Sequence, residues 1–253
     1  MFDITEMKVN IKLDKQKMIE QLQGCLKKIC TVSKKSNYSV LTDCNNREVL
    51  VIEGNNIYYT SLSKEKQCFN ISECKKIRYF TTINTVYRKL YSDGNDDVAV
   101  VWLLIGENGN EKKLVQVGRN NRLANALRGD INVDARCIME GSGAEKYVKL
   151  GEKFEKLIFY QVNIDEYLKM CNDRNIYLIM NEHSPQNKYL KRAYYNFKAA
   201  YVEGKIASLC DTEAGIWNSS GDIDDDIYQY YNKCNSSESH LFKGEINIGG
   251  KKL

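Results

Sequence analysis

The chain has 253 residues, of which 43% are hydrophobic and 28% are charged, so it is long enough to bury one large core or two small ones. Its formal net charge of +4 permits a nucleic-acid partner without requiring one. The longest apolar stretch, residues 98–105, is too short to span a bilayer. Acidic residues stand early at the N-terminus, unlike in a secretory signal, so we expect a cytoplasmic protein without a membrane partner.

The nine cysteines stand at irregular spacings and predict free thiols rather than a disulfide framework. No CxxC pair occurs, and neither His183 nor His240 stands at a zinc-binding spacing from a cysteine, so a zinc site is not expected. The sequence also lacks a Gly-rich nucleotide loop and a Ser-His-Asp arrangement. These absences argue against kinase, dehydrogenase and histidine-based hydrolase chemistry.

Residues 1–91 are predicted to form a small α/β module. It begins with a strand over residues 7–13 and continues with an amphipathic helix over residues 14–30. The helix is predicted from apolar residues at helical spacing, which are Met18, Ile19, Leu22, Leu26 and Ile29. Residues 47–53 and 57–62 follow as a hairpin around an Asn-rich turn, because Gly and Asn accept the positive φ that a tight turn requires.

A polar loop at residues 92–97 (SDGNDD) is predicted to separate this module from a second domain, residues 98–234. The second domain opens with a longer hairpin, in which a turn rich in Gly and Asn joins two runs of aliphatic residues. A short helix is predicted next, over residues 120–131, with Asn121 as its N-cap.

The remaining predicted elements of the second domain are a strand over residues 156–162, a helix from Ile164, and a long helix over residues 184–209 that starts at Ser184. Residues 235–253 form a polar tail. The predicted fold class is therefore α/β (α+β), with a small antiparallel sheet flanked by helices and preceded by the N-terminal module.

This order of elements, over residues 98 to about 234, resembles the GIY-YIG endonuclease domain. Val100-Val101-Trp102 stands where the family has its first triplet, and Gln116-Val117-Gly118 stands where it has its second. Tyr201-Val202-Glu203 resembles the stretch that supplies the family's metal-binding carboxylate. The resemblance implies a metal-dependent hydrolase that cleaves phosphodiester bonds, with Glu203 as the ligand of Mg²⁺.

The chain departs from the family at its signature residues. Trp102 has no hydroxyl group where the family has a tyrosine, and Gln116 cannot act as a base. The position of the family's arginine falls near Ala126 in this chain. Arg122 or Arg128 can take the role of that arginine only if the alignment of this helix with the family is shifted. The candidate catalytic set is thus Trp102, Gln116, Arg122, Arg128 and Glu203.

Several residues that carry the resemblance have a structural alternative. Trp102 lies in an apolar strand, and such a position is more typical of a core aromatic residue than of a substrate contact. Gly118 fits a turn glycine at a strand end as well as a residue that admits a phosphate. A glutamate on a helix, such as Glu203, is by default exposed on the surface.

Two basic segments are candidates for nucleic-acid binding. Arg119, Arg122 and Arg128 surround a helix start, where an anion is favoured, although they also fit the solvated face of a short helix. Basic and aromatic residues interleave in residues 188–198, as in Lys191, Arg192, Tyr194 and Lys198. That mixture suits a phosphate backbone with stacked bases, and it equally suits an amphipathic helix with a tyrosine-rich core face.

The sequence thus predicts a protein that binds or processes nucleic acid, with DNA in preference to RNA. The alternative is a catalytically inactive binding protein that keeps the same fold as a scaffold. The two hypotheses differ in geometry. The enzyme is favoured if one cleft holds Glu203, Trp102, Gln116 and an arginine. The binding protein is favoured if Glu203 is directed away from the hairpin.

Overall fold

The structure is a computed structural model. It describes residues 19–60, 66–71, 98–170, 195–196, 198–203, 206, 247–248 and 251–252. Within these residues, no helix is long and apolar enough to cross a membrane. The five cysteines described are all free; they are Cys25, Cys30, Cys44, Cys68 and Cys137.

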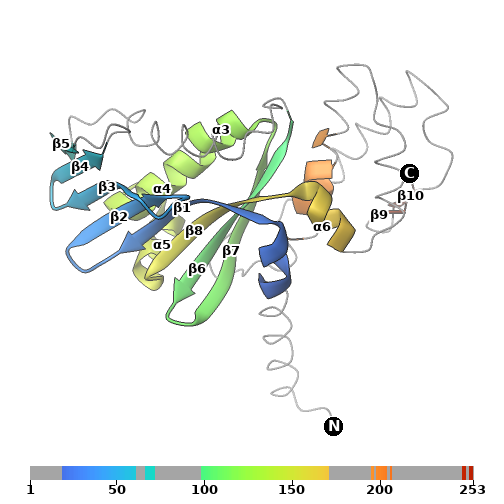
Figure 1. The fold of residues 1–253 in the computed structure, drawn as a ribbon, viewed down its shortest axis with the longest axis horizontal. Coiled ribbons are helices and arrows are strands. Elements are labelled where there is room, and N and C mark those ends of the chain that lie inside the picture. Colours follow the sequence, from blue (N-terminus) through green and yellow to red (C-terminus); the bar gives the residue numbers. More distant parts are fainter. Residues whose placement is uncertain are drawn as a thin grey trace, which may run out of the picture.

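The fold is α+β and is built on an eight-stranded antiparallel sheet (Figure 1). Its strands are β1 (Leu26–Lys34), β2 (Tyr38–Asp43), β3 (Glu48–Glu53), β4 (Asn56–Thr60), β5 (Lys66–Asn70), β6 (Val100–Asn108), β7 (Glu111–Asn120) and β8 (Lys156–Val162). The predicted hairpins correspond to β3–β4 and β6–β7, and the predicted strand over residues 156–162 is β8. Positive φ at Gly54 and Gly109 closes the two hairpin turns.

The order of strands is β5-β4-β3-β2-β1-β8-β6-β7. Strand β8 lies between β1 and β6 and is antiparallel to both, with Leu26 opposite Val162 and Val101 opposite the same residue. Strands from both of the predicted modules therefore belong to one sheet, which is larger than the small sheet expected. The loop predicted at residues 92–97 lies outside the described residues.

Helices cover both faces of the sheet. One face carries α3 (Leu123–Arg128), α4 (Asp130–Glu140) and α5 (Glu145–Lys153), whose apolar side chains form one core cluster with β1, β3, β6 and β8. The other face carries α6 (Ile164–Met170), the short turn η1 (Gln23–Cys25) and the helical residues 198–203. Their apolar side chains form a second cluster with β6 and β7.

The helix predicted over residues 14–30 is wrong in its C-terminal part. Residues 19–22 are helical, but η1 ends at Cys25, and Leu26 to Cys30 belong to β1. Gly24 weakens a helix here, and the β-branched residues that follow favour a strand. Pairing of β1 with both β2 and β8 then outweighs the helical spacing of its apolar residues.

The region between β7 and β8 holds two helices, α4 and α5, that the sequence did not predict. Helix α4 ends at Glu140, and the next residue, Gly141, adopts the left-handed conformation common at helix ends. The N-cap predicted for α3 is also wrong: Arg122 occupies that position, and no side chain caps the helix. Asn121 instead accepts a hydrogen bond from Asn125 Nδ2 at 3.0 Å.

Within the predicted long helix, residues 195–196, 198–203 and 206 are described and are helical, while the helix predicted from Ile164 corresponds to α6. In the predicted tail, β9 (Asn247–Ile248) and β10 (Lys251–Lys252) pair with each other. The strand predicted over residues 7–13 lies outside the described residues.

Candidate functional site

Trp102 and Gln116 lie on the face of the sheet that α3, α4 and α5 cover. Trp102 is buried in the first core cluster, and its ring lies 6.1 Å from that of Phe159 on β8. Gln116 is buried on β7 opposite Leu104 of the same cluster. Both side chains are therefore enclosed in the core, and Trp102 has the core role that was its structural alternative.

Gly118 accommodates the ring of Trp102. The two residues are opposite each other in the β6–β7 register, and a Cβ atom added to Gly118 would lie 2.5 Å from Trp102 Cε2. Since real Cβ atoms do not approach other atoms so closely, glycine is required for this packing. Gly118 therefore serves Trp102 within the strand, rather than a turn or a bound phosphate.

Gly118→Ala is expected to lower the free energy of unfolding by about 1 to 3 kcal/mol, because a methyl group would press into the tryptophan ring. The loss should shrink in a Trp102→Leu background, where the ring is gone. Urea unfolding of the four variants in this cycle measures the coupling. Gly24→Ala is the matched control, since an added Cβ there meets nothing within 4 Å. Additive effects at Gly118 and Trp102 would contradict this packing.

Gln116 belongs to a buried polar network with Tyr147 and Asp134. Tyr147 on α5 is hydrogen-bonded to both Gln116 and Asp134. Burial raises the pKa of Asp134 to about 7, although the Tyr147 hydrogen bond and the charge of Lys146 act in the opposite direction. Burial also raises the pKa of Tyr147. The network joins β7, α4 and α5 inside the core.

The two arginines of the candidate catalytic set, Arg122 and Arg128, lie at opposite ends of α3. Ala126, at the position of the family's arginine, is buried in the first core cluster. Arg122 is half-buried at the start of α3, and its backbone N–H donates to Asn120 Oδ1 at 3.3 Å. Arg128 is exposed in the last turn of α3.

Glu203 is fully buried, rather than exposed on a helix surface, and it lies on the opposite face of the sheet from Trp102. Its helix packs in the second core cluster with residues such as Val101 and Val117. Arg119 Nε donates to Glu203 Oε2 at 2.7 Å. The arginine comes from the end of β7 and is 25% exposed, so the pair ties the helix to the hairpin.

The predicted catalytic residues therefore do not converge on one cleft. The sheet separates Trp102 and Gln116 from Glu203, and the arginine that meets the carboxylate is Arg119. A guanidinium 2.7 Å from Glu203 Oε2 disfavours a divalent cation there. In the described part of the chain, no three His, Cys, Asp or Glu side chains gather as a metal site would require. The residues present do not fit the Mg²⁺ that the resemblance implied.

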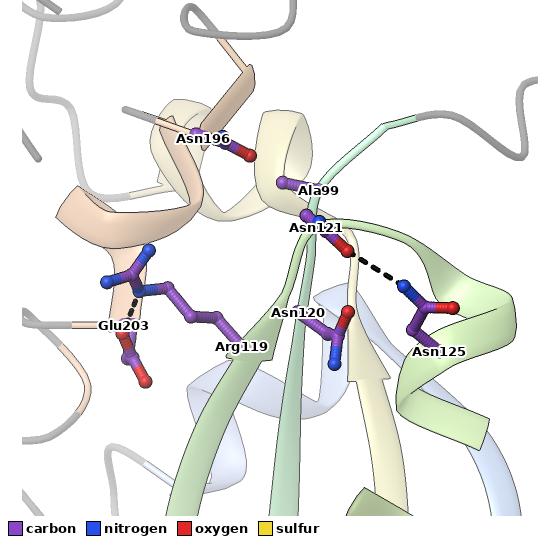
Figure 2. Close-up of a pocket in the computed structure, with 7 residues that line it drawn as sticks. All are labelled: Ala99, Arg119, Asn120, Asn121, Asn125, Asn196 and Glu203. Carbon is purple, nitrogen blue, oxygen red and sulfur yellow. Dashed lines mark hydrogen bonds and ion pairs between the residues drawn. The ribbon is translucent and has the colours of Figure 1, made fainter. Parts of the chain in front are cut away.

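An open polar pocket of about 500 Å³ lies beside the Arg119–Glu203 pair, at the end of the sheet where β6 begins and β7 ends (Figure 2). Its described lining consists of Ala99, Arg119, Asn120, Asn121, Asn125, Asn196 and Glu203. We call this the amide pocket, because four of its seven described lining residues are asparagines. Its volume is in the range of sites that hold small organic ligands.

Three of the asparagines come from consecutive parts of the chain: Asn120 ends β7, Asn121 follows it, and Asn125 lies in α3. Asn120 Nδ2 donates to Asp130 Oδ2 at 3.1 Å, which fixes this asparagine against the start of α4. The Asn125 amide donates to Asn121 Oδ1 and retains its own carbonyl oxygen. Asn121 uses its oxygen in this hydrogen bond, so its amide N–H groups can donate to a ligand. The pocket thus presents donors and acceptors side by side.

Lys198 lies near the amide pocket but is itself buried. Its ammonium group donates to Asp165 Oδ1 at 2.7 Å, which joins its helix to α6. Lys191, Arg192 and Tyr194 lie outside the described residues. Of the segment predicted to interleave basic and aromatic residues, Tyr195, Asn196 and Lys198 are thus described.

Comparisons with family models, with curated proteins and with solved structures find no match for this chain. The amide pocket therefore has to be interpreted from its own chemistry. Sequence reasoning missed it, although one signal was present: Asn120, Asn121 and Asn125 cluster around a helix start that already carried three arginines.

Proposed function

We propose that this protein binds nucleic acid without cleaving it, and that the amide pocket receives the edge of an unpaired base. The observation that carries the proposal is the set of asparagine side chains at the end of the β6–β7 hairpin. An amide offers one donor and one acceptor in a plane, which matches the paired donor and acceptor on a base edge. An unpaired base presents its Watson–Crick edge to a pocket, whereas that edge is occupied by the complementary base in a duplex.

The charge around the pocket supports the same proposal. Arg119 lines it, and Arg122 and Arg128 stand at the N-cap and in the last turn of α3, the helix that supplies Asn125, so three arginines lie within ten positions of the sequence. Cations near a base pocket attract the phosphate backbone in any sequence, while the amides supply selectivity. Because Glu203 holds Arg119, we assign this carboxylate to fixing the pocket wall and not to catalysis.

We expect single-stranded oligonucleotides to bind and Asn121→Ala/Asn125→Ala to weaken that binding at least tenfold, since a well-placed amide pair contributes about 1 to 3 kcal/mol to base recognition. Fluorescence anisotropy with DNA and RNA strands and with a duplex measures this. Asn110→Ala, at the turn at the other end of the same hairpin, is the matched control. Equal loss in both variants would overturn the assignment of the pocket.

Arg122→Ala and Arg128→Ala should each flatten the salt dependence of binding by about one unit of slope for each phosphate that the guanidinium group neutralises in the parent protein. In parallel, the parent protein is incubated with the same strands and Mg²⁺. We expect the strands to remain intact. Cleavage that disappears in a folded Glu203→Gln variant would overturn the proposal in favour of a nuclease.

A further inference from the structure

The asparagines of the amide pocket stand on different elements of the chain. Asn121 follows β7 and Asn125 lies in α3, whereas Asn196 belongs to the helical residues 195–196. Figure 2 shows Asn196 and Asn125 on separate helices at different parts of the pocket wall. A flat ligand that enters the pocket can therefore meet amide groups at more than one of its edges.

These amides differ in what the fold leaves for a ligand. Both ends of the Asn120 amide are held by neighbouring residues, so this side chain belongs to the wall. Asn125 Nδ2 donates to Asn121 Oδ1, which leaves N–H groups of Asn121 and the carbonyl oxygen of Asn125. Among the described residues, none is a hydrogen-bond partner of the Asn196 side chain, which keeps its donors and its acceptor. The pocket thus offers two sets of a donor beside an acceptor.

Two such sets match one base better than the others. Adenine carries its N6 amino group between N1 and N7, so a donor stands beside an acceptor on both its Watson–Crick edge and its Hoogsteen edge. Guanine presents two acceptors, N7 and O6, on the Hoogsteen edge. Cytosine and thymine have no ring nitrogen there. A base other than adenine would leave part of one amide set without a partner, and such an unpaired group lowers affinity.

We infer that the amide pocket selects adenine, which it holds by both edges at once. A single asparagine amide pairs with N6 and N7, so Asn196 is assigned to the Hoogsteen edge. On the Watson–Crick edge, an N–H group of Asn121 donates to N1, and the Asn125 carbonyl oxygen accepts the second hydrogen of N6. The inference rests on the proposed function and names the base that the pocket receives.

Thymidylate strands with one central adenine, guanine or cytosine test the selection, because they differ at a single base in a common background. Fluorescence anisotropy is expected to show the adenine strand binding at least tenfold more tightly than the others, since one bidentate amide pair discriminates between bases by about that factor. Equal affinity for all strands, or tighter binding of guanine or cytosine, would overturn the selection of adenine and leave the proposed function standing. Absence of binding by every strand would overturn both.

A strand with a central 7-deazaadenine tests the role of Asn196, because a C–H group replaces N7 and removes only the Hoogsteen acceptor. The parent protein should bind this strand about tenfold more weakly than the adenine strand, and Asn196→Ala should bind both strands equally. Asn110→Ala, the control at the hairpin turn, should discriminate between them as the parent does. The assignment of Asn196 is wrong if Asn196→Ala still discriminates between the two strands, or if the parent protein does not.

Discussion

Arg119→Ala is expected to lower the free energy of unfolding by about 3 kcal/mol or more, because it removes the guanidinium partner of a fully buried carboxylate. Glu203 would stay enclosed between its helix and the β6–β7 hairpin while losing the guanidinium charge that lies 2.7 Å from its Oε2. Removal of one member of a buried pair typically costs about 3 to 5 kcal/mol. Urea unfolding at neutral pH measures the change.

Two further variants separate charge from packing. Arg119→Met/Glu203→Leu removes both charges and should recover most of the lost stability, since an apolar pair avoids the desolvation cost. Lys112→Ala breaks a more exposed pair with Glu107 on the same hairpin and should cost less than about 1 kcal/mol. An Arg119→Ala variant as stable as Lys112→Ala would contradict the structural role of the buried pair.

The stability of the protein is expected to fall as the pH rises from about 4 to 7, and Asp134→Asn should remove this dependence. The pKa of Asp134 is about 7 in the folded chain, against an ordinary value of 3.8. Between these two pH values, the folded state holds a proton that the unfolded state has released. Protonation therefore stabilises the fold below pH 4, and the contribution is lost as the pH passes through 7.

The difference of about three pKa units corresponds to roughly 4 kcal/mol at most. Asparagine keeps an oxygen that accepts the Tyr147 hydroxyl, so Asp134→Asn should match the parent near pH 4 and exceed its stability at pH 8 by up to that amount. Urea unfolding at both pH values measures this. Glu145→Gln on α5 is the control. The Lys149 hydrogen bond lowers the pKa of this exposed carboxyl, so the effect of Glu145 on the pH dependence of stability is small and opposite in sign to that of Asp134. Parallel pH profiles for the parent and Asp134→Asn would contradict the prediction.

Local patterns predicted the hairpins and the helix α6 from sequence alone. In the β6–β7 hairpin, Gly109 stands between two aliphatic runs, and this signal needs no information from elsewhere in the chain. The β1 segment is different. Leu22, Leu26 and Ile29 fit a helix by spacing, whereas the start of the strand, Leu26 to Lys28, pairs with β8, more than a hundred positions later. Long-range pairing overrode the local pattern there.

The candidate site could be predicted only in part. The sequence singled out Arg119 and Glu203 but gave them separate roles, since nothing local indicates that residues 84 positions apart form a pair. Strand alternation held a further clue. Gln116 and Arg119 are three positions apart on one strand, so they point to opposite faces, and a carboxylate that meets Arg119 cannot also meet Gln116. A family template that places all of them in one cleft conceals this.

The position of β8 in the sequence also determines when the sheet can be completed during translation. On the ribosome, β1 has β2 on one side, while its other edge stays open until β8 emerges roughly 120 residues later. At translation rates of about 5 to 20 residues per second, this interval lasts roughly 6 to 25 s. Strand β6 pairs with β7 on one side, and its other edge stays unpaired until the same strand, β8, is made. Until β8 joins them, the nascent chain carries two unpaired strand edges to which a neighbouring chain can add.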